Sequence, residues 1–213
     1  MTYDLAKQWD LPVHKIFLGM LESAVIFFER HVQCVNELNV FPVPDGDTGT
    51  NMFGTLKGIQ SKLQSGTAYS LEDIMKKASE AALLEGRGNS GIILSQIFRG
   101  LYEGFDFQHP IDMHNLSSAM DKASERAYGA VGDPVEGTIL TVLSDIAITC
   151  NRLKNSGTDI CNAFGILHAS AVTSVDGTPS KLNVLNEAGV VDSGGYGLEI
   201  ILKGMELFFT QED

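Results

Sequence analysis

Residues 139–150 read Ile-Leu-Thr-Val-Leu-Ser-Asp-Ile-Ala-Ile-Thr-Cys and carry the clearest structural pattern in the chain. The apolar side chains of this stretch recur at intervals of three or four residues, at Ile139, Leu143, Ile146 and Cys150. This period places them on one face of an α-helix. In a half-buried strand, apolar residues would instead alternate with polar ones, because successive side chains point to opposite faces. The stretch therefore predicts an amphipathic helix.

Similar helical spacing recurs along most of the 213-residue chain. It predicts further helices at about residues 11–36, 51–63, 71–82, 89–102, 115–129, 159–175 and 198–209. Ser70 is expected as the N-cap of the third helix, and Thr178-Pro179 as the N-cap and first residue of a shorter one. No segment shows the alternating β-branched and aromatic pattern of a strand. We therefore expect an all-α fold, an up-and-down bundle of about eight helices whose short connections make neighbours antiparallel.

The composition is that of one globular domain spanning residues 1–213, with 44% hydrophobic and 20% charged residues. Acidic residues outnumber basic ones by 27 to 15, and the formal charge of −12 disfavours nucleic acids and anionic membranes as partners. The most apolar stretch, residues 16–28, is interrupted by Glu22 and is too short to span a bilayer.

Cys34, Cys150 and Cys161 form no paired framework, and we expect them as small buried hydrophobes in a reducing environment. The sequence thus predicts a cytoplasmic domain without a membrane span. The sequence is also compatible with a homo-oligomer, and with a domain that forms the N-terminal part of a longer protein.

Glycine is unusually frequent for a helical protein, with 22 residues, and it gathers just before predicted helices. Four clusters combine glycine with Asp, Asn, Ser or Thr, at residues 45–51, 86–91, 132–138 and 192–195. Free backbone N–H groups and the positive end of the helix dipole favour anions at helix starts. Glycines that end helices or allow positive φ would give the same pattern without a ligand. We favour phosphate or nucleotide binding, because alternate turns of an up-and-down bundle lie at the same end.

Asp45 and Asp47 flank Gly46, so their carboxylates can converge on one point. Such hard oxygen ligands suit Mg²⁺, which keeps several waters and takes further ligands from phosphates. The two acids could otherwise cap the next helix or face solvent. An EF-hand loop starting at Asp45 is excluded, because Thr50 and Leu56 stand where it needs glycine and glutamate.

The sequence excludes other common nucleotide-binding and metal-binding motifs. Gly86, Gly88 and Gly91 have dinucleotide-binding spacing, but they follow a helix-forming segment where that motif requires a strand. No Gly-Lys-Ser/Thr sequence occurs, which excludes a P-loop, and the five histidines lack metal-binding spacing.

One long motif is specific to a family. The chain resembles the nucleotide-binding domain of the dihydroxyacetone-kinase superfamily at residues 39–52, Asn-Val-Phe-Pro-Val-Pro-Asp-Gly-Asp-Thr-Gly-Thr-Asn-Met, and at 88–91, 137–138 and 192–195. Within it, the chain is most similar to the N-terminal domain of the bacterial fatty acid kinase ATP-binding subunit. The resemblance covers about residues 11–210, and implies a barrel of eight antiparallel helices that binds Mg-ATP at one end.

The resemblance also implies site residues. Asp45 and Asp47 would hold a pair of Mg²⁺ ions, and Asn39 is the nearest counterpart of a third aspartate found in the dihydroxyacetone branch. The residues implied to contact ATP or ADP are Thr48, Gly49, Thr50, Asn51, Gly88, Asn89, Ser90, Gly137, Thr138, Asp192, Gly194 and Gly195.

The function implied is that of a kinase that transfers the γ-phosphoryl group of ATP to a fatty acid presented by a lipid-carrier protein, giving an acyl phosphate. A carboxylate acceptor is already ionised, so it needs no general base, and the sequence shows none. Two alternatives remain. The chain could be an ADP-carrying phosphotransfer subunit of a dihydroxyacetone kinase, or a regulator that binds nucleotide or lipid without turnover.

Overall fold

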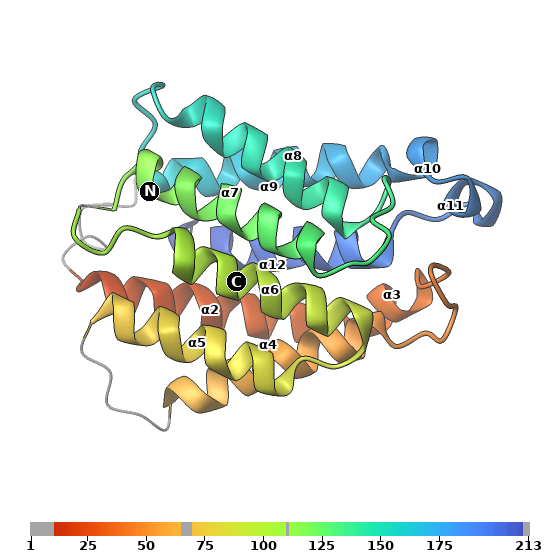
Figure 1. Cartoon of the computed structure of the whole chain (residues 1–213), viewed down its shortest axis with the longest axis horizontal. Helices are drawn as coiled ribbons and strands as arrows, with labels where there is room; N and C mark the ends of the chain where they lie inside the picture. The colour runs from red at the N-terminus through yellow and green to blue at the C-terminus, as the bar shows by residue number, and fades with distance from the viewer. Residues whose placement is uncertain (1–10, 65–69, 110, 211–213) are drawn as a thin grey trace.

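The computed structural model describes residues 11–64, 70–109 and 111–210, and within these ranges every regular element is a helix (Figure 1). The eight long helices are α2 (Val13–Glu29), α4 (Thr48–Gln64), α5 (Leu71–Glu85), α6 (Gly88–Gly104), α7 (Met113–Gly129), α8 (Ile139–Leu153), α9 (Ile160–Asp176) and α12 (Ser193–Thr210). Three short helices are α3 (Val32–Glu37), α10 (Thr178–Lys181) and α11 (Asn183–Ala188). The predicted all-α fold is confirmed.

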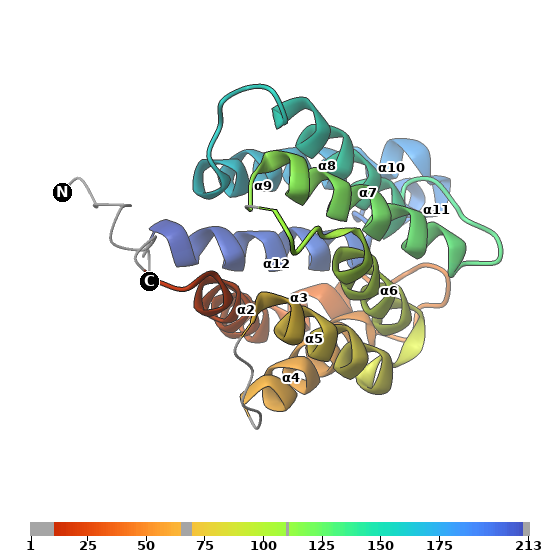
Figure 2. The ribbon, with the colours of Figure 1, turned by 60° about the vertical axis from the view of Figure 1, so that its left-hand side comes forward.

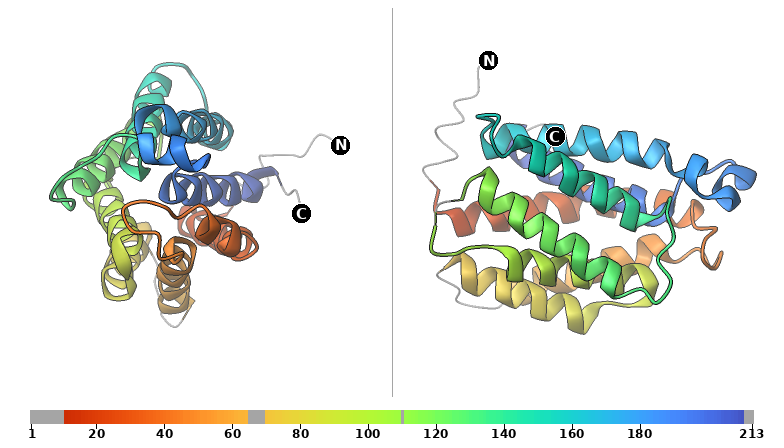
Figure 3. Two further views of the ribbon diagram at one scale, coloured as in Figure 1. Left: turned by 90° about the vertical axis from the view of Figure 1, so that its right-hand side faces the viewer. Right: turned by 45° about the horizontal axis from the view of Figure 1, so that its top comes forward.

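The long helices form a closed ring. Each packs against the next long helix along the chain, and α12 packs against α2 to complete the circuit, which Figure 3 (left) shows nearly end-on. In Figure 2, α12 lies between α2 and α9. At the closing contact, a Cβ on Gly204 would overlap the backbone of Ala24, and Ser23 Oγ donates a 2.6 Å hydrogen bond to the Gly204 carbonyl. The barrel that the family resemblance implied is thus present.

The first predicted helix is wrong in one respect, because it is broken into α2 and α3. The Nδ1 atom of His31 lies 2.8 Å from the carbonyl oxygen of Phe27, which in a continuous helix would accept the backbone N–H of His31. The His31 N–H bonds instead to the Phe28 carbonyl at 2.8 Å. The chain therefore turns at this point, and α3 lies against α4.

Several helix starts also differ from the prediction. α4 begins at Thr48 and α12 at Ser193, so Gly49 and the pair Gly194-Gly195 lie inside the first helical turn, whereas Gly46 still precedes α4. Ser70 is the expected N-cap, since its hydroxyl accepts the Asp73 N–H at 3.1 Å. Thr178 is the first residue of α10, and Gly177 takes the N-cap position. Of the three cysteines, Cys150 and Cys161 are buried as expected, but Cys34 is exposed.

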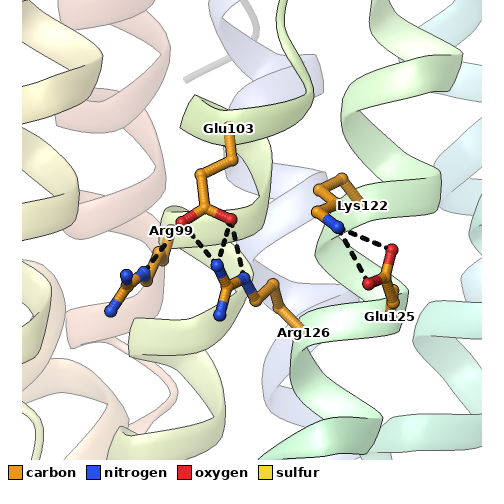
Figure 4. Close-up of polar contacts among 5 residues, drawn as sticks. All are labelled: Arg99, Glu103, Lys122, Glu125 and Arg126. Carbon is orange, nitrogen blue, oxygen red and sulfur yellow. Dashed lines mark hydrogen bonds and ion pairs between the residues drawn. The ribbon is translucent and has the colours of Figure 1, made fainter.

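Charged side chains join α6 to α7 on the outside of the barrel (Figure 4). Glu103 of α6 accepts hydrogen bonds from Arg126 of α7, at 2.6 Å from Nε and 2.7 Å from Nη2, and from Arg99 Nε at 2.9 Å. Burial alone would raise the pKa of Glu103, but these two arginines lower it overall. Lys122 and Glu125 form a second pair, which stays within α7.

The barrel interior contains a cavity of about 160 Å³ that is lined only by apolar side chains, from Val13 of α2 to Phe209 of α12. Among the described residues, none of the helices combines the length and the hydropathy needed to cross a membrane.

Candidate functional site

Two asparagines hold the loop that precedes α4. Asn39 is buried, and its Oδ1 accepts the Asp47 N–H at 3.2 Å while its Nδ2 donates to the Val43 carbonyl at 3.1 Å. Asn36 of α3 accepts the Thr50 N–H at 3.1 Å and donates to Thr50 Oγ1 at 3.0 Å. The break after α2 therefore allows α3 to pack with its asparagine against the first turn of α4.

Asp45 and Asp47 both lie exposed on this loop, separated by Gly46 with φ of +67°. No cluster of three or more metal-ligating His, Cys, Asp or Glu side chains occurs in the ranges that the structure describes. The donor set available here is two carboxylates, which fits an ion such as Mg²⁺ that retains waters. Asn39 differs from the two aspartates, because its side-chain amide already forms hydrogen bonds to the backbone of the loop.

Thr48 joins the starts of three helices. Its backbone carbonyl accepts a 3.4 Å hydrogen bond from Ser90 Oγ of α6, and its Oγ1 accepts one of 3.3 Å from Ser193 Oγ of α12. All three side chains are buried. The first turns of α4, α6 and α12 therefore meet at this threonine.

Asn51 and Gly88 provide a second contact between α4 and α6. Gly88 has φ of +61°, and a Cβ there would overlap the side-chain amide of Asn51. Only glycine meets both requirements without strain. Asn89, the next residue, is exposed.

Asp192 joins α12 to α8. Its Oδ2 accepts the Gly195 N–H at 2.7 Å, and the N–H groups of Gly194 and Ile139 also bond to its carboxylate. Burial raises the pKa of Asp192 to about 6, against the lowering effect of these three hydrogen bonds. Gly195 allows a close approach of the two helices, since a Cβ there would lie 2.8 Å from Val142 Cγ2.

The start of α8 has its own polar network. Thr138 is the N-cap, and its Oγ1 donates to the Val135 carbonyl at 2.8 Å. The Gly137 N–H donates to Thr141 Oγ1 at 2.8 Å, and that hydroxyl in turn donates to Glu136 Oε2 at 2.6 Å. These bonds fix the turn that leads into α8.

A pocket of about 320 Å³ opens among these helix starts. The helix starts themselves lie at the right-hand end of the barrel in Figure 1. Six of the sequence-predicted residues line it, namely Thr48, Asn89, Ser90, Thr138, Asp192 and Gly194. The structure places the other predicted residues in the same turns but outside the lining, namely Asn39, Asp45, Asp47, Gly49, Thr50, Asn51, Gly88, Gly137 and Gly195.

Further lining residues were not predicted as site residues, and most are apolar: Phe41, Pro42, Ile92, Ile93, Ala130, Val131, Gly132, Asp133, Val135, Ile139, Leu140 and Ser193. Some of them, such as Gly132 and Ser193, lie in the glycine clusters, and this position in the sequence could have identified them as site residues. Ile92, Ile93, Ile139 and Leu140 have the helical spacing of core residues, so periodicity does not single them out. The other apolar lining residues lie outside the helices, and two of them, Phe41 and Pro42, belong to the motif at residues 39–52.

The chemistry of the pocket follows from the helices around it. The N-termini of α4, α6, α8 and α12 all reach it, and each carries a partial positive charge and backbone donors. Thr48, Ser90 and Thr138 add hydroxyl groups to the lining, and Ile92, Val131 and Val135 add apolar side chains. This combination suits an elongated ligand with an anionic end and a flat apolar end.

Comparison with known families gives an independent result. Residues 42–207 match the DAK2 domain. The chain belongs to the DAK2 domain family. This confirms the superfamily that the sequence motifs indicated, and the matched residues include every helix start around the pocket of this DAK2 domain.

Its sequence relatives are bacterial proteins of greater length. An uncharacterized protein of Staphylococcus haemolyticus is 38% identical over 190 residues, a match that covers 89% of this chain and 34% of that protein. Uncharacterized proteins of Staphylococcus epidermidis and Staphylococcus aureus match with the same identity and cover 34% and 35% of their lengths. The DAK2 domain thus spans about a third of the curated relatives it matches.

Solved structures share the fold. The dihydroxyacetone kinase from C. freundii in complex with AMP-PNP and Mg²⁺ superposes with a TM-score of 0.66 at 19% identity, covering 89% of this chain and 33% of that one. Its native form gives a TM-score of 0.64 with the same identity and coverage. The DAK2 domain therefore has the helical fold of one part of that kinase.

Proposed function

We propose that this DAK2 domain binds Mg-ATP in the pocket at the helix starts. The observation that carries the proposal is the convergence of four helix N-termini beside a loop with two exposed aspartates. The structural relative with AMP-PNP and Mg²⁺ supports the same ligand class.

In this arrangement the phosphates lie against the first turns of α4, α6, α8 and α12, whose lining residues Thr48, Ser90, Thr138 and Ser193 carry hydroxyl groups. Asp45 and Asp47 hold Mg²⁺, which neutralises phosphate charge when bound. A domain with a formal charge of −12 needs such compensation. The base lies against apolar lining side chains such as Ile92 and Val131.

We further propose that the acceptor is a fatty acid carboxylate presented by a lipid-carrier protein. One carboxylate oxygen attacks the γ-phosphorus, the bond from that phosphorus to the β,γ-bridging oxygen breaks, and an acyl phosphate and ADP result. No proton moves, so no general base is required. The resemblance at residues 39–52 supports this choice over a dihydroxyacetone phosphotransfer subunit. A cytoplasmic location follows from the need for ATP.

A second candidate function is lipid binding without turnover. The apolar cavity inside the barrel favours it, because a cavity lined only by apolar side chains accepts apolar ligands. In that case the glycine turns would serve packing alone.

The test is calorimetric titration of the chain with a non-hydrolysable ATP analogue, with and without Mg²⁺. We expect binding that requires Mg²⁺ and that Asp47→Ala abolishes, while Asp121→Ala on the exposed face of α7 leaves it unchanged. Absence of binding by the folded wild-type chain would reject the nucleotide site and favour the lipid-binding candidate. Exchange of bound nucleotide with free ATP then separates a kinase from a subunit that retains ADP.

A further inference from the structure

The carboxylate of Asp192 lies where the first turns of α8 and α12 meet. The residue is 5% exposed, and the backbone N–H groups that bond to its carboxylate come from both helices, Ile139 from α8 and Gly194 and Gly195 from α12. A helix usually caps its N-terminus with a side chain that serves that helix alone. Asp192 serves two helices at once.

The backbone of Asp192 is held as firmly as its side chain. Its N–H donates to Thr178 Oγ1 at 3.0 Å, and that fully buried hydroxyl donates in turn to the Val175 carbonyl at 2.7 Å. Its own carbonyl accepts the Tyr196 N–H at 2.9 Å within α12. The position of the carboxylate is therefore fixed by α9, α10 and α12 together.

The two helices that it joins both contribute residues to the pocket lining. Thr138 and Ile139 line the pocket from α8, and Ser193 and Gly194 line it from α12. A carboxylate oxygen that already accepts backbone N–H groups has little capacity left for a ligand. The hydrogen bonds of Asp192 therefore indicate that its carboxylate sets the spacing of the two helices rather than binding the ligand directly.

We propose that Asp192 is a positioning residue, whose carboxylate sets the spacing between α8 and α12 and thereby places Thr138 and Ser193 around the phosphates. This inference rests on the proposed nucleotide site. It assigns to Asp192 a function different from the direct nucleotide contact that the family resemblance implied.

The decisive variant is Asp192→Ser. Serine is an equally good N-cap for α12, but its shorter side chain cannot also reach Ile139 of α8. Asp192→Asn retains the length and an oxygen acceptor but lacks the charge. The matched control is Asp159→Ser, because Asp159 caps α9 by accepting the Asn162 N–H at 3.0 Å and does not line the pocket.

The measurement is the dissociation constant for a non-hydrolysable ATP analogue with Mg²⁺, with helical content followed by circular dichroism. We expect Asp192→Ser to remain folded and to bind about tenfold more weakly, as loss of positioning predicts. We expect Asp192→Asn to bind within about threefold of the wild type, and Asp159→Ser to bind like the wild type.

Three results would overturn the inference while leaving the nucleotide site intact. They are unchanged affinity in Asp192→Ser, an equal loss in Asp159→Ser, and an equal loss in Asp192→Asn, which would show that the charge itself contacts ligand or metal. A wild-type chain that binds no nucleotide rejects the proposed function instead, so the two failures are distinguishable.

Discussion

Ser193 Oγ donates a hydrogen bond to Thr48 Oγ1 across 3.3 Å, although the two residues are 145 positions apart in the chain. Both are buried in the first turns of their helices, α12 and α4. Since α4 follows the loop with the two aspartates and α12 follows Asp192, this bond links the two ends of the candidate site.

Ser193→Ala tests that link. The substitution removes the donor and leaves Thr48 Oγ1 buried with one partner fewer, so we expect the free energy of unfolding to fall by about 1 kcal/mol. Urea unfolding measures the change. Ser156→Ala is the control, because Ser156 lies exposed in the turn after α8 and should change stability by less than about 0.5 kcal/mol. Equal effects of the two substitutions would show that the buried hydrogen bond adds nothing measurable to the free energy of unfolding.

The helices themselves follow from the sequence because each long one has an apolar face. The pattern around Ile139 and Leu143 is sufficient to predict α8, whose buried face includes both. The break between α2 and α3 is different, since it depends on the His31 ring taking a backbone acceptor. Val35 continues the apolar spacing across the break, so the hydrophobic period contains no sign of it.

The candidate site also contains some residues that the sequence predicts and others that it does not. Polar residues such as Thr48, Ser90 and Thr138 are predicted by the glycine-rich clusters and the family resemblance, and the structure brings them to one pocket. Asn36 escaped prediction, because its contact with Thr50 depends on how α3 packs against α4. Contacts between segments distant in sequence require the tertiary fold, which local patterns do not encode.

Asn39→Asp distinguishes a structural from a metal-binding role at this position. We expect weaker nucleotide binding, because aspartate cannot donate to the Val43 carbonyl and the loop that carries Asp47 would lose one of its anchors. A loss of about 1 kcal/mol in stability should accompany it. Titration with the ATP analogue at several Mg²⁺ concentrations checks this, and tighter Mg²⁺ binding by the variant would instead support Asn39 as the counterpart of a metal-binding aspartate.

Glu103→Gln tests the charged contact between α6 and α7. We expect a loss of about 1 kcal/mol at neutral pH and low salt, because Glu103 pairs with arginines from both helices. The pKa of Glu103 is lowered in the folded state, so its contribution is fully present above the unfolded value of 4.5 and is lost as the pH falls through the lower pKa of the folded state. Unfolding at pH 7 and pH 3 measures this dependence.

The control for that experiment is Glu125→Gln, which removes a pair made within α7 only. Its effect should be at most about 0.5 kcal/mol. A difference between Glu103→Gln and the wild type that is as large at pH 3 as at pH 7, or that is unaffected by added salt, would contradict an electrostatic origin.

Asp192→Asn should alter the dependence of stability on pH. Because burial raises the pKa of Asp192 from 3.8 to about 6, the folded state binds this proton more tightly than the unfolded state does. The wild type therefore gains stability as the pH falls through about 6 towards 4, whereas asparagine has no proton to bind. We expect the free energy of unfolding of the wild type to rise by about 2–3 kcal/mol relative to the variant between pH 8 and pH 4. Urea unfolding across that range measures it, and a constant difference between the two proteins would show that Asp192 titrates as an ordinary exposed carboxylate despite its position between α8 and α12.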